Sequence, residues 1–361
     1  GATAAAVVSS GGLRERPAAD APPLLEFTGV HKEFPVRAGV LQRQVASVKA
    51  VSGVSFSVAA GETFGLVGES GSGKTTVGRL VAALDPVDSG SIRFDGVDLS
   101  SLPRSKLRRA RRDVQLMFQD AYASLNPRMH VGSSLREPLT IQRVGTRAER
   151  NARVAELLDQ VGLPRVAADR YPHEFSGGQR QRIGLARALA LHPRLIVADE
   201  PVSALDVSIQ AQMLNLMKSL QADLGLTYIF ISHDLSVVRY LADRIGVMYL
   251  GKLVETGPSE SIYASPVHPY TAGLLEAVPE PDPVRERAKN SAVITGDLPS
   301  ALTPPSGCRF RTRCPRAQDR CAAEEPLPRR FGTGHLAACH FPLEPVADEE
   351  AKADGSAAAV K

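Results

Sequence analysis

The sequence predicts an α/β fold in which a parallel sheet is covered by helices on both faces. Three short apolar runs, Thr63–Val67, Leu195–Ala198 and Thr227–Ile231, have the length and composition of buried strands. They alternate along the chain with segments whose apolar residues recur at helical spacing, Thr76–Leu84 and Ser208–Leu220. Strands that alternate with helices in this way are typical of a parallel sheet.

A small antiparallel β-subdomain is predicted around the first of these units. Leu24–Val30 and Val48–Val58 precede it, and the second alternates apolar with polar residues, as a half-buried strand does. Ser91–Phe94, followed by an Asp-Gly turn, adds a strand after it. Ile245–Leu250 and Leu253–Glu255 predict a closing hairpin later in the chain.

Residues from about 121 to 182 predict a helical subdomain inserted into the α/β core. Thr146 and Glu149 form a capping-box pattern at the start of a helix, and Gly162 is suited to end it. The apolar residues between them fall on one stripe, which is typical of a helix with one buried face: Val154, Leu157, Leu158 and Val161.

Composition divides the 361 residues into four parts. Residues 1–22 and 346–361 lack apolar periodicity and are predicted to be a disordered lead-in and tail. Residues 23–257 form the α/β domain, and residues 258–345 form a small, irregular, proline-rich segment with all four cysteines. The net charge of +4 is too small to favour nucleic-acid binding, and no run of eighteen apolar residues predicts a membrane span.

A glycine-rich loop lies between the first predicted strand and helix. It fits G-x-x-x-x-G-K-[ST], the phosphate-binding P-loop, and so predicts a P-loop NTPase (RecA-like) core. We expect its lysine to reach the β- and γ-phosphates and its threonine hydroxyl to ligate Mg²⁺. The candidate nucleotide-binding residues here are Gly68, Ser70, Gly71, Ser72, Gly73, Lys74, Thr75 and Thr76.

Two further motifs are suited to nucleotide chemistry. Asp199-Glu200 closes the Leu195–Ala198 strand, where one carboxylate could hold Mg²⁺ and the other could polarise an attacking water. Ser176-Gly177-Gly178-Gln179 opens a helix whose free amides are also suited to phosphate. Because the P-loop already binds the nucleotide, a second phosphate-binding helix predicts a dimer in which this helix covers the nucleotide of the other subunit.

The order of these motifs resembles that of ABC-transporter ATPases from about residue 24 to 257. The resemblance implies that Glu200 is the general base, His233 contacts the γ-phosphate, Gln119 touches Mg²⁺, and Asp206 couples the two sites of a dimer. Lys74 and the signature residues Ser176–Gln179 would neutralise the transferring phosphoryl group. Phe34 is the candidate for stacking on adenine, and Phe175 replaces the usual leucine before the signature.

The C-terminal segment narrows the resemblance to the oligopeptide/dipeptide importer ATPases. The supporting stretches include His268-Pro269-Tyr270-Thr271 and the residues that lead into the first cysteine. Four thiolates suit tetrahedral Zn²⁺ or an iron–sulfur cluster, and a P-loop ATPase in reducing cytosol disfavours disulfides. The resemblance favours a [4Fe–4S] cluster over zinc and over unligated thiols, with these ligands: Cys308, Cys314, Cys321 and Cys339.

This resemblance implies an ATPase that powers import of di- or oligopeptides, or of a related small solute. Its partners would be a second ABC ATPase subunit, two transmembrane permease subunits and an extracytoplasmic substrate-binding protein. It would lie at the cytoplasmic face of the cell membrane. A soluble ABC-type ATPase that acts on nucleic acid or the ribosome is the alternative, although such chains usually have two ATPase units or long coiled coils. A metal-sensing regulator is a third hypothesis, which the presence of Glu200 disfavours.

Overall fold

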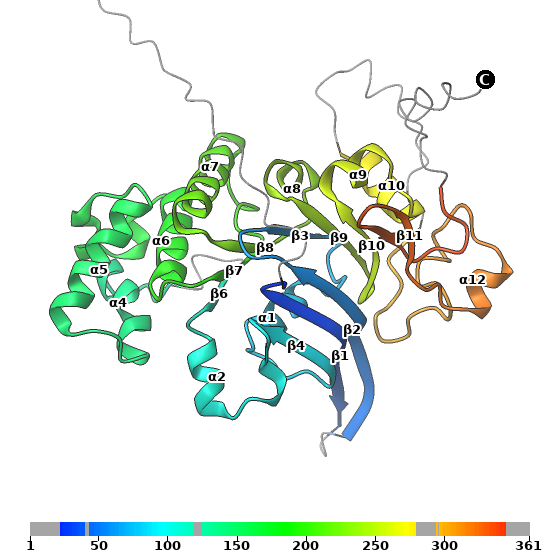
Figure 1. The fold of residues 1–361 in the computed structure, drawn as a ribbon, viewed down its shortest axis with the longest axis horizontal. Coiled ribbons are helices and arrows are strands. Elements are labelled where there is room, and N and C mark those ends of the chain that lie inside the picture. Colours follow the sequence, from blue (N-terminus) through cyan, green and yellow to red (C-terminus); the bar gives the residue numbers. More distant parts are fainter. Residues whose placement is uncertain (1–21, 40–42, 119–124, 279–293, 295, 344–361) are drawn as a thin grey trace, which may run out of the picture.

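The computed structural model describes residues 22–39, 43–118, 125–278, 294 and 296–343. The predicted tail, 346–361, and all but the last residue of the predicted lead-in, 1–22, lie outside these described residues. Within them, the chain forms an α/β structure with two sheets and a helical region at one end (Figure 1).

The larger sheet has eight strands in the order β11-β12-β10-β9-β3-β8-β7-β6. Its five strands from β9 to β6 are parallel, and the other three are antiparallel. The strands are β3 (Thr63–Val67), β6 (Val114–Met117), β7 (Leu195–Asp199), β8 (Thr227–Ser232), β9 (Arg244–Tyr249), β10 (Lys252–Pro258), β11 (Arg329–Gly332) and β12 (His335–Ala337). The predicted buried strands and the closing hairpin are confirmed. Strands β11 and β12 were not predicted, and they attach residues beyond 328 to the edge of the same sheet.

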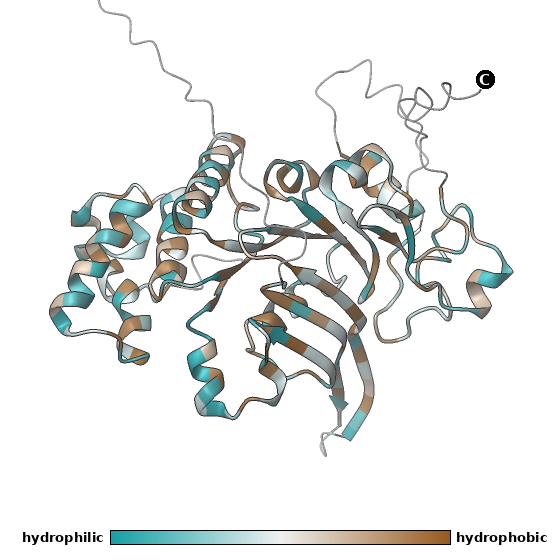
Figure 2. Cartoon of the chain, viewed as in Figure 1, coloured by the Kyte–Doolittle hydropathy of each residue, from teal (hydrophilic) through white to brown (hydrophobic). Residues whose placement is uncertain are grey.

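The smaller sheet is antiparallel, in the order β2-β1-β4-β5. Its strands are β1 (Leu25–Ala38), β2 (Arg43–Val58), β4 (Ser89–Phe94) and β5 (Val97–Asp98). The first two are longer than the sequence predicted. Figure 2 shows hydrophobic and hydrophilic residues in alternation along these strands, as a sheet with one buried face requires.

Helix α1 (Lys74–Val81) packs in the core that the two sheets share. Val77, Leu80 and Val81 are buried in this core. A stack of three aromatic rings also joins the sheets, with ring centroids 4.9 Å apart for Phe27 and Phe56 and 4.8 Å apart for Phe56 and Phe64. The antiparallel sheet is therefore held firmly against the strand that leads into the P-loop.

The helical region contains α4 (Val131–Ile141), α5 (Arg147–Gln160) and α6 (Gly177–Leu189), with the 3₁₀ turns η2 (Arg165–Asp169) and η3 (Pro172–Glu174). The predicted capping box is confirmed, because Thr146 accepts from the Glu149 amide and the Glu149 carboxylate accepts from the Thr146 amide. Gly162 follows the helix with φ of +68°, a conformation that favours glycine. The apolar stripe of α5 is buried, as predicted.

The remaining helices are distributed along the rest of the chain. They are η1 (Leu99–Ser101), α2 (Arg104–Ala110), α7 (Val207–Leu224), α8 (Leu235–Leu241), α9 (Ser259–Ala264), α10 (Pro269–Glu276) and α12 (Asp319–Ala323). None of the helices in the described part of the chain is long and apolar enough to cross a membrane. The larger hydrophobic core includes Tyr270 and Phe310, so the C-terminal segment shares the core of the α/β domain.

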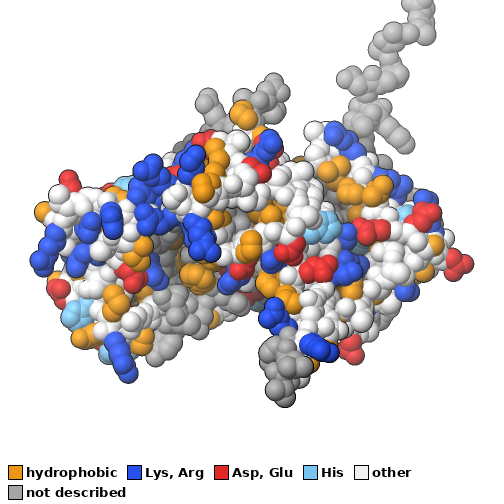
Figure 3. All heavy atoms as spheres, turned by 90° about the horizontal axis from the view of Figure 1, so that it is seen from below, with side chains coloured by type: hydrophobic (Ala, Val, Ile, Leu, Met, Phe, Trp, Pro, Cys, Tyr) orange, Lys and Arg blue, Asp and Glu red, His pale blue; other side chains and the backbone are white. Residues whose placement is uncertain are grey.

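Lys and Arg side chains gather over the end of the molecule that the helical region forms (Figure 3). Several of these arginines are paired with acidic side chains of the same region. Ion pairs join Arg165 to Asp159 at 2.7 Å and Arg187 to Glu137 at 2.8 Å. Arg112, which precedes β6, donates to both oxygens of Gln142 at the end of α4, and so ties the core to the helical region.

Candidate functional site

The predicted phosphate loop connects β3 to α1 in the arrangement that the motif requires. Gly68 has φ of +146°, and a Cβ there would lie 2.2 Å from the Met248 carbonyl oxygen. Gly73 has φ of +105°, and a Cβ there would lie 2.2 Å from the Ala50 carbonyl oxygen. Glycine is therefore required at both positions, because the loop follows the backbone of β9 and β2 too closely for any side chain. The fold thus holds the loop in one shape.

Lys74 lies inside this loop and is 5% exposed. Its Nζ donates to the carbonyl oxygens of Gly68 at 2.7 Å and Glu69 at 2.9 Å. Burial lowers the pKa of this lysine, while the nearby Glu200 and Asp199 carboxylates act in the opposite direction. Among the described residues, the hydrogen bonds of Lys74 go to carbonyl oxygens and a hydroxyl of the loop, and a partly desolvated cation is suited to exchange these for phosphate oxygens.

Thr75 and Asp199 come together across the site from α1 and β7. The Thr75 hydroxyl donates to Asp199 Oδ1 at 3.3 Å, and Asp199 is 4% exposed. Burial is the main cause that raises the pKa of Asp199, with the Thr75 hydrogen bond opposing it. A hydroxyl and a carboxylate beside a phosphate loop are the donor set that Mg²⁺ takes in P-loop proteins, so these residues fit the predicted ion.

Glu200 and His233 lie at the carboxyl ends of the adjacent strands β7 and β8. His233 Nδ1 is 3.0 Å from Glu200 Oε1, and the Glu200 amide donates to the Ile231 carbonyl oxygen at 2.9 Å. Glu200 has φ of +48°, which is uncommon for a residue with a side chain. Strained backbone of this kind is concentrated at functional sites, because the surrounding structure must hold it.

The second predicted phosphate-binding helix begins elsewhere in the molecule. Ser176 is the N-cap of α6, where its hydroxyl accepts from the Gln179 amide and Gln179 Oε1 accepts from the Ser176 amide. Ser176, Gly177 and Gln179 are exposed, and no hydrogen bond joins the described residues 176–179 to the described residues 68–76. Within one chain, the two predicted phosphate-binding sites are not brought together.

Glycine is also required at position 178 by the packing of α6 against α7. A Cβ there would lie 2.4 Å from Ile209 Cγ2 on α7. Asp206 is the N-cap of that same helix, accepting from the Ile209 amide at 3.0 Å and the Ser208 hydroxyl at 2.7 Å. These hydrogen bonds lower the pKa of Asp206. The start of α6 and the start of α7 are thus adjacent, which the sequence order alone did not predict.

Three further predicted residues have different outcomes. Phe34 lies on β1 and is 38% exposed, with Lys32 Nζ 5.5 Å from its ring centroid. Phe175 is buried, and the Arg170 guanidinium carbon lies 4.7 Å from its ring centroid. Gln119 lies outside the described residues. Phe34 therefore has an accessible ring, and Phe175 has a packing role in the helical region.

The four cysteines are free thiols in the C-terminal segment. Burial is the main cause that raises the pKa of Cys308 to about 11 and that of Cys339 to about 12, and the neighbouring thiols add to both shifts. No group of three or more His, Cys, Asp or Glu side chains within the described ranges is placed to hold a metal ion. The structure therefore does not confirm the predicted cluster.

Sequence reasoning missed two contacts to the phosphate loop from the C-terminal segment. Arg313 forms a two-bond ion pair with the Glu69 carboxylate, and the Tyr270 hydroxyl accepts from the Glu69 amide at 2.9 Å. These partners are separated from Glu69 by 244 and 201 residues. Pairings at such distances leave no periodic signal in a single sequence.

Comparison with family models gives two matches along the chain. Residues 51–203 match the model described as ABC transporter. Residues 254–321 match the model described as oligopeptide/dipeptide transporter, C-terminal region.

Curated relatives match over nearly their whole length. The oligopeptide transport ATP-binding protein AppF of Bacillus subtilis is 52% identical over 325 residues, which are 90% of this chain and 99% of the relative. A putative peptide import ATP-binding protein of Brucella ovis is 54% identical over 317 residues, which are 88% of this chain and 97% of the relative.

A solved structure has the same cassette fold. It is an ATP-binding cassette described as a dimer in a post-hydrolysis state bound to ADP and Pi. The TM-score is 0.58 at 29% identity, over 65% of this chain and 98% of that one. About a third of this chain lies outside the match, whereas nearly all of that cassette lies within it.

Proposed function

This chain belongs to the ATP-binding subunits of the oligopeptide/dipeptide ABC transporter family, and on that premise we propose that it hydrolyses ATP to power import of di- or oligopeptides, or of a related small solute, through a membrane ABC importer. The observation that carries the proposal is the convergence of Lys74, Thr75, Asp199, Glu200 and His233 on one end of the parallel strands. These residues come from α1 and from the carboxyl ends of β7 and β8. Together they supply a cation for the phosphates, ligands for Mg²⁺, and a carboxylate and an imidazole for the attacking water.

The P-loop side of the site would bind the nucleotide. The loop amides from Gly68 to Thr76 and the Lys74 ammonium would cradle the phosphates, and the exposed ring of Phe34 would stack on the adenine. Lys74 is already within the loop, so it needs only to exchange its carbonyl partners for phosphate oxygens. Binding therefore requires little rearrangement of this part of the protein.

The chemical step would depend on charge and orientation. Glu200 would accept a proton from the attacking water, and His233, 3.0 Å from its carboxylate, would orient that carboxylate and contact the γ-phosphate. Thr75 and Asp199, together with Gln119, would hold Mg²⁺, which supplies neutralisation of charge on the phosphate oxygens when bound. Lys74 would add to this neutralisation.

A second ATPase subunit would complete the site. The start of α6 is exposed and has no contact with the phosphate loop of its own chain among the described residues. Its amides and the Ser176 hydroxyl would therefore meet the nucleotide of the partner, with Asp206 beside them at the start of α7. The likeness to a cassette described as a dimer with ADP and Pi supports this arrangement.

The permease subunits would dock beside the helical region. A hollow of about 150 Å³ lies between β6, α4 and α6, and its lining includes Met117, Phe118, Pro138 and Gln181. Phe118 is 46% exposed there, and it immediately precedes Gln119 in the sequence. A partner helix in this hollow would bury the exposed ring. The subunit would thereby lie on the cytoplasmic face of the membrane, and an extracytoplasmic binding protein would deliver the solute.

We also propose that the four cysteines bind a [4Fe–4S] cluster, with zinc as the alternative. All four donors are soft thiols that are partly or fully buried. Burial is the main cause that raises the pKa of Cys308, Cys314 and Cys339, and neighbouring thiols add to each shift. The four cysteines lack the short C-x2-C spacing that is typical of zinc sites, which favours the cluster. Iron, sulfide and zinc analysis of anaerobically purified protein tests this. About four irons per chain would support the cluster, stoichiometric zinc would support the alternative, and neither would refute both.

Steady-state phosphate release with Mg-ATP tests the ATPase proposal. Lys74→Ala should reduce turnover by at least about 100-fold, because it removes a charge that stabilises the transferring phosphoryl group. Lys218→Ala is the matched control, since Lys218 is exposed on α7 and donates to the Tyr240 carbonyl oxygen. Equal turnover in the two variants would refute the proposed site.

A further inference from the structure

We propose that Arg313 is a positioning residue for nucleotide binding, which it supports by holding Glu69, the second residue of the phosphate loop, in place. The inference rests on the proposed function, because it concerns the affinity of that same loop for ATP. It assigns to the C-terminal segment a direct role in the nucleotide site. The argument has three steps, which concern Glu69, Arg313 and the attachment of the loop that carries Arg313.

Glu69 is held at each of its polar groups. Arg313 Nη1 donates to Glu69 Oε2 at 2.6 Å, and Nη2 donates to Oε1 at 3.0 Å, which is the parallel two-bond geometry of a strong guanidinium–carboxylate pair. The Glu69 amide donates to the Tyr270 hydroxyl on α10. Its carbonyl oxygen accepts from Lys74 Nζ at 2.9 Å and from the Ser72 amide at 3.2 Å.

ATP binding would remove one of these restraints. When Lys74 turns to the phosphates, the Glu69 carbonyl loses its bond to Lys74 Nζ. The bonds from Arg313 and Tyr270 come from another part of the chain and do not involve Lys74. They would therefore keep the loop in its binding shape while the lysine exchanges partners.

The Arg313–Glu69 pair also reduces an electrostatic repulsion in the nucleotide site. A carboxylate in a phosphate-binding loop repels the anionic ligand, and Arg313 neutralises it in place. The Arg313 side chain is 8% exposed, and the hydrogen bond to Glu69 is the main cause that raises its pKa. Its guanidinium carbon also lies 5.9 Å from the ring centroid of Tyr249 on β9. Breaking a part-buried ion pair is costly from either side, because it leaves the remaining charge without its partner.

The turn that carries Arg313 is fastened to the ATPase core. Phe310, three residues earlier, is 1% exposed, and its ring centroid is 5.2 Å from that of Tyr249 and 5.3 Å from that of Tyr270. Arg309 donates to the Ser52 hydroxyl at 2.9 Å and to the Leu250 carbonyl oxygen. The Arg313 amide donates to the Phe310 carbonyl oxygen at 2.9 Å. Arg313 is therefore presented by a rigid turn.

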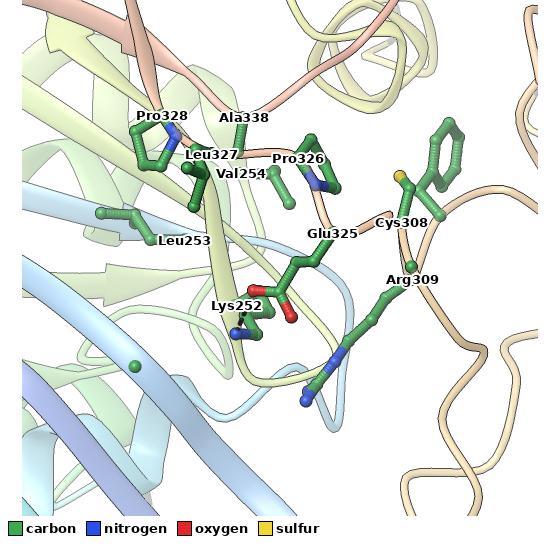
Figure 4. Close-up of a pocket in the computed structure, with 13 residues that line it drawn as sticks. Lys252, Leu253, Val254, Cys308, Arg309, Glu325, Pro326, Leu327, Pro328 and Ala338 are labelled. Carbon is green, nitrogen blue, oxygen red and sulfur yellow. Dashed lines mark hydrogen bonds and ion pairs between the residues drawn. The ribbon is translucent and has the colours of Figure 1, made fainter. Parts of the chain in front are cut away.

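Figure 4 shows the seam between this turn and the β9–β10 hairpin, where a cavity of about 140 Å³ separates the two. Lys252 on β10 forms an ion pair with Glu325, in the stretch that follows α12, and Arg309 extends over the same cavity. The turn is thus joined to the hairpin by the Arg309 side chain as well as by the buried rings. Cys308 and Cys314 lie on either side of this turn, and Arg313 within it pairs with Glu69 of the phosphate loop.

Titration of Mg-ADP onto the full-length chain tests the inference. Arg313→Gln should weaken ADP binding by about tenfold or more, because it leaves the Glu69 carboxylate without its countercharge. Arg313→Lys keeps the charge without the two-bond geometry, so it should recover part of the loss. In turnover, KM for ATP should rise with kcat changed by less than about twofold, since Arg313 does not touch the reacting atoms.

Arg311→Gln is the matched control. Arg311 lies in the same turn, and its hydrogen bonds go to Ser306 within the C-terminal segment. It should therefore bind ADP as the unmodified protein does. Glu69→Gln, which changes only the loop side of the pair, should also weaken binding, and the double variant with Arg313→Gln should lose little more than the worse single variant.

Unchanged ADP affinity in Arg313→Gln, with unmodified protein that binds ADP, would overturn the inference and leave the proposed function intact. Additive losses in the double variant would also overturn it, because they would show that the two residues act separately. Failure of the unmodified protein to bind ADP would instead refute the proposed function.

Discussion

Two helices of this protein begin with glycine-rich sequences that are suited to phosphate binding, and they differ in how the amides of their first turns are capped. Helix α1 has Gly73 as its N-cap, in a left-handed conformation and without a side-chain hydrogen bond to its amides. Helix α6 has Ser176 as its N-cap, with a complete capping box formed with Gln179. The amides of α1 are open to a ligand, whereas one amide of α6 is already satisfied within its own helix.

Their surroundings differ in the same direction. The loop before α1 is enclosed by the backbones of β2 and β9 and is held by Arg313 and Tyr270. The start of α6 is exposed, and it packs against α7 where Gly178 lies close to the Ile209 side chain. A helix start that is open and rigid can bind phosphate alone, whereas one that is self-capped and exposed needs a second surface to present the ligand. The comparison therefore assigns binding to α1 and completion of the site to α6.

The largest expected effect separates binding from chemistry on the α1 side. Glu200→Gln keeps the size of the side chain but removes its proton-accepting capacity, so phosphate release should fall by about 10² to 10⁴-fold. ADP affinity should stay within about threefold of the unmodified value, because Glu200 lies outside the phosphate loop. Parallel turnover and titration measurements check this. Retained turnover would show that Glu200 is not the base.

The folding stability of the protein should depend on pH through His268, the N-cap of α10. Burial lowers the pKa of this histidine to about 4, against 6.5 in an unfolded chain. Between pH 4 and pH 6.5 the folded state therefore binds fewer protons than the unfolded state. Stability should be complete above pH 6.5 and should decrease as the pH falls towards 4, by up to about 3 kcal/mol. Chemical denaturation at several pH values measures this slope.

His268→Asn supplies the control for that slope. Asparagine can still accept from the Tyr270 amide, as His268 Nδ1 does now, but it does not titrate. The variant should lose stability less steeply between pH 6.5 and 4 than the unmodified protein. Equal slopes would mean that another group causes the acid sensitivity.

A smaller effect is expected where α6 meets α7. Gly178→Ala would place a Cβ 2.4 Å from Ile209 Cγ2, which is close to a branched carbon and cannot yield easily. We expect a loss of about 2 kcal/mol in the free energy of unfolding. Adding Ile209→Ala should restore part of the loss, because it removes the methyl group that clashes. A double variant no more stable than Gly178→Ala would contradict this explanation.

The smallest effect on stability is expected at the cap of α6. Ser176→Ala removes the hydroxyl that accepts from the Gln179 amide, which should cost about 1 kcal/mol of folding stability. ATP turnover should fall more than this loss suggests, because the same hydroxyl is proposed to meet the partner's nucleotide. Ser176→Asn should restore the cap, and recovery of turnover together with the cap would argue that only the cap matters.

The residues that the sequence could locate are those whose roles depend on local spacing. The loop from Gly68 to Thr75, the capping box at Thr146, the helix start at Ser176 and the carboxylates at the end of β7 are each recognisable within a few residues. Such features follow from strand and helix periodicity and from cap chemistry, which act over one or two turns.

Other features could not be predicted because they pair residues that lie far apart in the sequence. Arg313 and Glu69 are 244 residues apart, and neither has a neighbouring pattern that indicates the other. The short strands β11 and β12 pair with the edge of an existing sheet, and three or four residues carry too little alternation to be recognised. The hairpin β9–β10 was predicted. The pairing of another strand with its outer edge was not.

Titration of Mg-ADP onto dilute single chains tests the central comparison most directly, with the unmodified protein, Lys74→Ala and Ser176→Ala side by side. We predict one site per chain, unchanged in Ser176→Ala and lost in Lys74→Ala, because α1 alone binds the phosphates within one chain. If Ser176→Ala weakens ADP binding as much as Lys74→Ala does, the two helix starts act together within a single chain and the account is contradicted.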